Sequence, residues 1–185
     1  MAYRPPYRDA DSIYVEGQHP ATLEEGAFMA QCELSAGRGS GPGGQHRNKV
    51  QTGIRIVHLP TGIEARGTER REAQVNKSRA IFRLRLKLAR TVRTQVGRTN
   101  HEPSDLWESR RQGRKLPVNP KHHDYPALLS EALDVVYARK FDVAGAAGVL
   151  GITMSQLTRL IRQEPPAIAQ VNRGRELVGL PRLRS

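Results

Sequence analysis

A glycine-rich stretch followed by polar side chains holds the residues best able to do chemistry. Four glycines and one proline lie between Gly39 and Gly44, and the next five residues are Gln, His, Arg, Asn and Lys. Glycine tolerates positive φ and lets another backbone approach closely. Bare N–H groups beside basic side chains suit phosphate oxygens. The stretch therefore predicts a loop that is carried into a nucleic-acid-rich site, with Gln45 acting there.

The motif Arg-x-Ser-Gly-Pro-Gly-Gly-Gln-His-x-Asn-Lys at residues 38–49 carries a family resemblance. It closely resembles the catalytic loop of bacterial-type peptide chain release factors and of their stand-alone ribosome-rescue relatives. The resemblance runs from about Cys32 to Ala89 and includes Asn76. It departs at Glu72-Ala73, where the family usually has Ser-Gln, and at Arg47, where the family often has Val.

The resemblance implies a peptidyl-tRNA hydrolase that acts at the peptidyl transferase centre of the ribosome, on rRNA and peptidyl-tRNA, without cofactor or metal. Hydrolysis of the ester passes through a tetrahedral oxyanion, which a backbone N–H can stabilise. The catalytic residues are then Gly43 and Gly44, which let the backbone approach, and Gln45, which donates its N–H and positions water. The residues expected to contact RNA are Arg38, Ser40, His46, Arg47, Asn48, Lys49, Arg70, Arg71, Asn76 and Lys77.

The positive charge is concentrated around this stretch. The chain of 185 residues has a formal net charge of +12. Residues 35–100 hold 15 Lys or Arg and 3 Asp or Glu, so this segment alone carries +12 and the rest sums to zero. A field confined to one segment indicates a polyanion partner such as RNA. A solvated face that only aids solubility does not need such confinement.

Composition limits the class of protein. Apolar residues make up 37% of the chain, and it has no run of 18 apolar residues, so we expect no membrane span. The first residues lack the apolar region of a signal peptide. The single cysteine, Cys32, excludes an internal disulfide. We expect a monomeric cytoplasmic protein.

The periodicity predicts an α+β fold: a small antiparallel β-sheet with a packed long helix and the projecting Gly-Gly-Gln loop, followed by a small all-α C-terminal domain. Alternation and β-branched residues predict strands at 32–36, 53–59 and 63–68. Residues 82–88 alternate like a strand, but Ala, Arg, Lys and Leu favour one long helix over 72–96. A short helix is expected over 22–31, with Thr22 as a possible cap.

The C-terminal part has helical spacing from Tyr125, and residues 142–162 resemble a helix-turn-helix, with Thr153 capping the second helix. On that helix Ser155, Gln156, Arg159 and Arg162 are expected to face outward. A last helix is predicted over 167–178. The predicted organisation is 1–21 disordered or loosely packed, 22–97 the hydrolase-like domain, 98–123 a linker, and 124–185 the helix-turn-helix-like domain.

Other chemistries are weaker. The loop glycines match the spacing of a dinucleotide fingerprint, but no amphipathic helix follows them. His122, His123 and Asp124 could bind a metal, yet adjacent histidines point in different directions and no further ligand spacing is visible, so a polar linker is the better interpretation.

The favoured function is codon-independent hydrolysis of peptidyl-tRNA in ribosome rescue, because too few residues precede Cys32 to hold a codon-reading domain. One alternative is a non-catalytic ribosome- or RNA-binding protein, which keeps the basic surface. The other is a DNA-binding helix-turn-helix regulator. Against the latter, residues 102–185 carry 13 basic and 9 acidic residues, a net of only +4.

Overall fold

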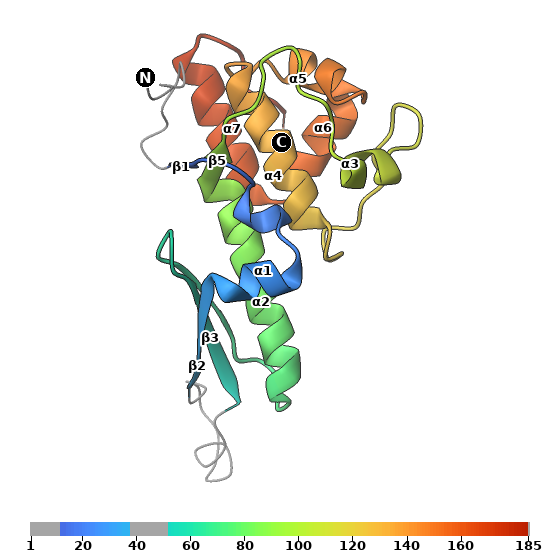
Figure 1. The fold of residues 1–185 in the computed structure, drawn as a ribbon. Coiled ribbons are helices and arrows are strands. Elements are labelled where there is room, and N and C mark those ends of the chain that lie inside the picture. The colour runs from blue at the N-terminus through green and yellow to red at the C-terminus, as the bar shows by residue number, and fades with distance from the viewer. Residues whose placement is uncertain (1–11, 38–51, 185) are drawn as a thin grey trace. The chain divides into compact units, whose positions relative to one another are not determined.

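The computed structural model describes residues 12–37 and 52–184, which form two compact units (Figure 1). The sheet unit is Leu23–Leu88, and the helical unit combines Met1–Thr22 with Ala89–Ser185. The predicted α+β class is confirmed, with a small antiparallel sheet, one long helix and several C-terminal helices.

A three-stranded antiparallel sheet is one of the two main parts of the sheet unit. Its strands are β2 (Cys32–Gly37), β3 (Gly53–His58) and β4 (Ile63–Gly67), in the spatial order β2-β3-β4. The turn between β3 and β4 closes when Gly62 donates its N–H to the His58 carbonyl at 2.8 Å. Gly62 has a φ of 68°, a conformation that glycine adopts without strain. All three predicted strands are confirmed to within a residue or two.

Two helices complete the sheet unit. Helix α1 (Glu25–Ala30) confirms the short helix expected there, but the cap assigned to Thr22 is wrong. Thr22 belongs to the 3-10 turn η1 (Pro20–Thr22) and donates its hydroxyl to the His19 carbonyl at 2.8 Å. Helix α2 (Ala73–Thr91) places Ala80, Leu84 and Leu88 in the core.

The prediction of a helix as far as residue 96 is wrong over its last residues. After α2 the chain forms β5 (Val92–Thr94), which pairs in parallel with β1 (Ile13–Val15). Both Val92 and Arg93 are buried. Pairing between segments that are far apart in sequence leaves no local periodicity, so neither β1 nor β5 was expected.

Five helices build most of the helical unit: α3 (Asp105–Arg110), α4 (Tyr125–Ala138), α5 (Val143–Val149), α6 (Met154–Arg162) and α7 (Pro165–Leu177). Helix α4 is its core, since every residue of it except Glu131 and Ala138 is buried. Within α4, Asp134 accepts a hydrogen bond at 2.9 Å from Arg93 of β5, an ion pair that is almost wholly buried.

The segment between β5 and α4 also packs onto the helical unit. Trp107 of α3 is fully buried and donates its indole N–H to the Leu150 carbonyl at 2.9 Å. Ser104 caps α3 by accepting the N–H of Trp107 at 3.1 Å. The domain boundaries proposed from the sequence stay a prediction. No helix in the described ranges combines the length and apolar character needed to cross a bilayer.

Candidate nucleic-acid interface

Strands β2 and β3 flank the glycine-rich motif in the sequence. Their last pair before it is Gly37 with Gly53. Residues 38–51 lie outside the described residues, and with them the predicted catalytic residues Gly43, Gly44 and Gln45. Six of the expected RNA contacts lie outside as well: Arg38, Ser40, His46, Arg47, Asn48 and Lys49. The described part of the candidate site is therefore the region beside the motif, which we call its foot. It consists of the ends of β2, β3 and β4 nearest the motif and of the residues before and at the start of α2.

Glycines let the backbone close up at this foot. A Cβ at Gly53 would lie 2.9 Å from the Gly37 carbonyl oxygen, and a Cβ at Gly67 would lie 2.1 Å from the carbonyl oxygen of Asn76. Distances this short are steric clashes with backbone, so both positions require glycine. The consequence is that the first turn of α2 lies directly against the end of β4. A glycine inside a strand pattern is a signal for such close approach, and the sequence analysis did not use it at Gly67.

Asn76 connects three segments at the foot. Its amide N–H groups donate to the carbonyls of Thr52 and Arg70, both at 2.8 Å, and its Oδ1 accepts the N–H of Arg70 at 3.0 Å. The residue is fully buried. The structure thus places Asn76 as a residue that ties α2 to Thr52, the first described residue after the motif. Its expected contact with RNA would compete with these three hydrogen bonds.

The other predicted RNA contacts at the foot are basic and accessible. Arg70 and Arg71 are exposed and Lys77 is half-buried. Within the described ranges, no hydrogen bond or ion pair forms on their side chains. Asn76 bonds to the backbone N–H and carbonyl of Arg70, so the backbone that carries at least one of these cations is held in place. Free guanidinium and ammonium groups on an ordered backbone are suited to phosphate oxygens.

Four further cations of α2 are already used inside the sheet unit. Arg79 and Arg83 both pair with Glu69, and Lys87 donates to the Glu64 carbonyl at 2.8 Å. The Arg85 guanidinium lies 4.3 Å from the centre of the Phe28 ring. The hydrogen bond from Arg83 is the main cause that lowers the pKa of Glu69. These contacts divide the basic helix into internally bonded cations and the accessible group near its start.

The helix-turn-helix-like pair is present in the helical unit. Gly151 has a φ of 67° at the turn between α5 and α6, and Thr153 caps α6 by accepting the N–H of Gln156 at 3.2 Å, as expected. Ser155, Arg159 and Arg162 are exposed, whereas Gln156 is only partly so.

The cluster His122, His123 and Asp124 brings its ligand atoms within 4.8 Å of one another. However, the Asp124 carboxylate already accepts two hydrogen bonds from Arg110, one of them at 2.8 Å from Nε. His122 Nδ1 accepts the N–H of Asp124 at 3.2 Å. A guanidinium on the carboxylate disfavours a second cation there, and the cluster directly precedes α4.

Comparison with known proteins identifies the class of domain. The model of the RF-1 domain matches residues 28–120, which is just over half of the chain. The match includes the sheet unit from Phe28 onward, the Gly-Gly-Gln motif and the foot. The chain belongs to the RF-1 domain family and is a peptide chain release factor-like protein.

Individual relatives agree with this assignment. Peptide chain release factor PrfB1, chloroplastic, of Arabidopsis thaliana is 50% identical over 56 residues, which are 30% of this chain and 12% of the relative. Peptide chain release factor 1 of Xylella fastidiosa is 37% identical over 87 residues, 47% of this chain and 22% of the relative. That of Acidiphilium cryptum is 36% identical over 92 residues, 49% and 26% respectively. The chain thus aligns with about a quarter or less of each relative.

Proposed function

We propose that this protein hydrolyses the ester of peptidyl-tRNA on the ribosome, as a monomer and without reading a codon. The observation that carries the proposal is the motif at residues 38–49, with Gly43, Gly44 and Gln45, inside a chain that belongs to the RF-1 domain family. The family relatives named above are peptide chain release factors.

The chemistry assigns a role to each residue of the motif. Water attacks the ester carbonyl, the carbonyl oxygen gains negative charge, and the ribose hydroxyl leaves. Gly43 and Gly44 allow the backbone to approach the tRNA end without side-chain obstruction. The N–H of Gln45 stabilises the oxyanion, and its side-chain amide positions the attacking water.

The foot supports this proposal through position and charge. Asn76 and Gly67 hold the start of α2 against the strand ends. The residues on either side of the motif therefore belong to an ordered base. Arg70, Arg71 and Lys77 then supply positive charge near that base for rRNA phosphates. In this role Asn76 is a positioning residue and not itself an RNA ligand.

Peptide release from purified ribosomes carrying peptidyl-tRNA tests the proposal. Gly44→Ala is expected to lower the rate of release by about a hundredfold, because misplacing the reacting groups by an ångström has that effect. Gln45→Ala is expected to cost about tenfold, the value of one hydrogen bond. Gly26→Ala is the matched control, since a Cβ at Gly26 meets no atom within 4 Å.

The same assay separates the alternatives. Release that is equal on ribosomes with a stop codon, a sense codon or no codon supports codon independence. A wild-type protein that binds ribosomes but releases no peptide would leave only the non-catalytic RNA-binding function. Undiminished release by Gly44→Ala would remove the mechanism.

A further inference from the structure

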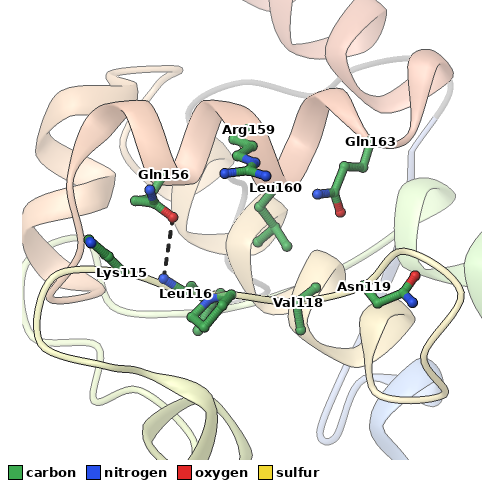
Figure 2. Close-up of a pocket in the computed structure, with 9 residues that line it drawn as sticks. Lys115, Leu116, Val118, Asn119, Gln156, Arg159, Leu160 and Gln163 are labelled. Atoms are coloured by element: carbon green, nitrogen blue, oxygen red, sulfur yellow. Dashed lines mark hydrogen bonds between the residues drawn. The ribbon is translucent and has the colours of Figure 1, made fainter.

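A pocket lies within the helical unit, between α6 and the segment 115–119 that runs beside it (Figure 2). Its volume is about 510 Å³, within the range of pockets that hold small organic ligands. The residues that line it are Lys115, Leu116, Pro117, Val118, Asn119, Gln156, Arg159, Leu160 and Gln163. Neither the RF-1 match nor the proposed hydrolysis assigns this pocket a role.

Two hydrogen bonds hold the segment near the start of α6. The N–H of Thr153 donates to the Arg114 carbonyl at 3.2 Å, and the N–H of Leu116 donates to Gln156 Oε1 at 3.5 Å. Leu116 is buried and anchors the segment. In Figure 2 the side chains of Gln156 and Leu160 extend from α6 toward the segment. The pocket therefore has two ordered walls.

The lining combines three kinds of group in one place. Leu116, Pro117, Val118 and Leu160 form an apolar part. Asn119, Gln156 and Gln163 bring side-chain amides with N–H donors, and the oxygens of Asn119 and Gln156 already accept the backbone N–H groups of Lys121 and Leu116. Lys115 and Arg159 are exposed cations, and none of the lining residues is acidic. An apolar surface for a ring, amides for its polar edge and cations for a phosphate match the parts of a nucleotide.

One acceptor in the pocket wall lacks a donor. Gln163 Oε1 is buried and has no hydrogen-bond partner in the described part of the chain. A buried polar atom without a partner is costly, because it has lost water and gained nothing. The terminal torsion of a glutamine side chain is broad, so the amide can turn to meet a donor in the pocket. An amino or imino group of a nucleobase is such a donor.

We propose that this pocket binds one unpaired nucleotide of single-stranded RNA. The base lies against Pro117 and Val118, the amides of Gln156 and Gln163 bond its edge, and Arg159 and Lys115 hold the flanking phosphates. The choice of RNA over DNA rests on the proposed function at the ribosome, whereas the choice of a nucleotide rests on the pocket alone.

The walls favour a single strand over a duplex. A helix that reads the major groove presents an unobstructed face to the base edges. Here the segment 115–119 lies along α6, and Gln156, near the start of α6, already accepts a hydrogen bond from the N–H of Leu116 in that segment. An unpaired base can leave its stack and enter a pocket, but a base pair inside a duplex cannot. The helix-turn-helix pair is thus used for a different kind of recognition from the one its sequence suggested.

Side-chain amide signals in NMR spectra of the full ¹⁵N-labelled chain test this proposal. The probes are the four nucleoside 5′-monophosphates, inorganic phosphate, a pentaribonucleotide, the matching pentadeoxyribonucleotide and duplex DNA. We expect saturable shifts of the Asn119, Gln156 and Gln163 amides with ribonucleotides and the pentaribonucleotide. Asn172, whose amide is bonded to Leu183 elsewhere in the helical unit, is expected to stay unshifted.

Two variants with a matched control locate the site. Arg159→Glu is expected to weaken binding of the pentaribonucleotide about tenfold or more. Gln163→Leu is expected to weaken binding of the nucleotides without changing the response to inorganic phosphate. Lys140→Glu reverses another exposed charge of the helical unit and is expected to bind like wild type.

The outcomes that overturn the proposal are distinct. Equal shifts with inorganic phosphate leave an anion site only, and unchanged binding by Arg159→Glu removes the pocket from RNA binding. Preference for duplex DNA at matched salt favours the regulator, and equal binding of the deoxy pentamer removes the choice of RNA. Failure of the hydrolysis proposal is read separately, in peptide release by the wild-type protein, which needs no pocket measurement.

Discussion

The sheet unit and the helical unit hold ion pairs at different depths. In the helical unit the pair Arg93–Asp134 is buried, with the side chains 1% and 3% exposed. In the sheet unit the pairs Arg55–Glu64 and Arg83–Glu69 lie at the surface. Removing one partner of a buried ion pair is strongly destabilising, whereas surface pairs contribute little to stability. The difference indicates that the Arg93–Asp134 pair helps to fix the structure of the helical unit, whereas the two surface pairs of the sheet unit do little to fix theirs.

The cores of the two units also differ in how many large side chains they bury. The sheet unit buries few large side chains, chiefly Phe28, Ile56, Leu84 and Leu88, and relies on glycine for close backbone contact. The helical unit buries nearly the whole of α4 together with Trp107. A thin core under a basic surface is suited to carrying a functional motif, and a thick core is suited to holding helices around a pocket.

Breaking the buried pair has the largest expected effect. Asp134→Ala leaves the Arg93 guanidinium buried without its carboxylate and is expected to lower the free energy of unfolding by about 4 kcal/mol. Glu69→Ala in the sheet unit is the control, and its expected cost is under about 1 kcal/mol. Denaturant unfolding of both variants measures this, and equal costs would contradict the contrast between the units.

Filling the space at Gly67 is expected to have the second largest effect on stability. Gly67→Ala places a Cβ where the Asn76 carbonyl lies and is expected to cost about 3 kcal/mol, because α2 must shift away from β4. Gly26→Ala, in open space on α1, provides the control. Hydrogen exchange of the β4 amides reports the effect within the sheet unit. Unchanged protection there would mean that α2 does not need this close approach.

Removing the Asn76 amide is expected to have a smaller effect on stability. Asn76→Ala deprives Thr52 and Arg70 of their hydrogen bonds and is expected to cost about 2 kcal/mol, because buried polar groups lose their partners. Gln74→Ala, two residues earlier on the exposed side, is the control. Peptide release should fall in Asn76→Ala while RNA affinity stays near wild type. Loss of RNA affinity without loss of stability would instead make Asn76 an RNA ligand.

The smallest expected effect is the pH dependence of the sheet unit. His58 is buried, with Nε2 and Nδ1 bonded to Gln31 and Thr61 at 3.0 and 2.8 Å, and burial lowers its pKa. The unfolded chain then binds a proton more readily than the folded one. The contribution of His58 is therefore present above about pH 6.5 and is lost as pH falls from there through the lowered folded pKa.

Unfolding free energies measured on both sides of about pH 6.5 test this dependence. His58→Gln is expected to flatten the acid side of the profile. His123→Gln, at a side chain that is 83% exposed, is the control and should keep the wild-type profile. A profile unchanged by His58→Gln would assign the acid sensitivity to other groups.

The sequence by itself determined the fold class, the three strands of the sheet, the Thr153 cap and the helix-turn-helix pair. These features are local: alternation, turn residues and capping residues act within a few positions of one another. The motif at residues 38–49 was equally visible, because its residue types alone carry the resemblance.

Only the tertiary structure decided what depends on distant segments. The pairing of Val92–Thr94 with Ile13–Val15 cut the predicted helix short, and the amide of Asn76 proved to be used inside the protein. The pocket beside α6 needs residues 115–119 to lie against a helix some forty positions later. Contacts of this kind follow from how elements pack, and no local pattern of residue types records them.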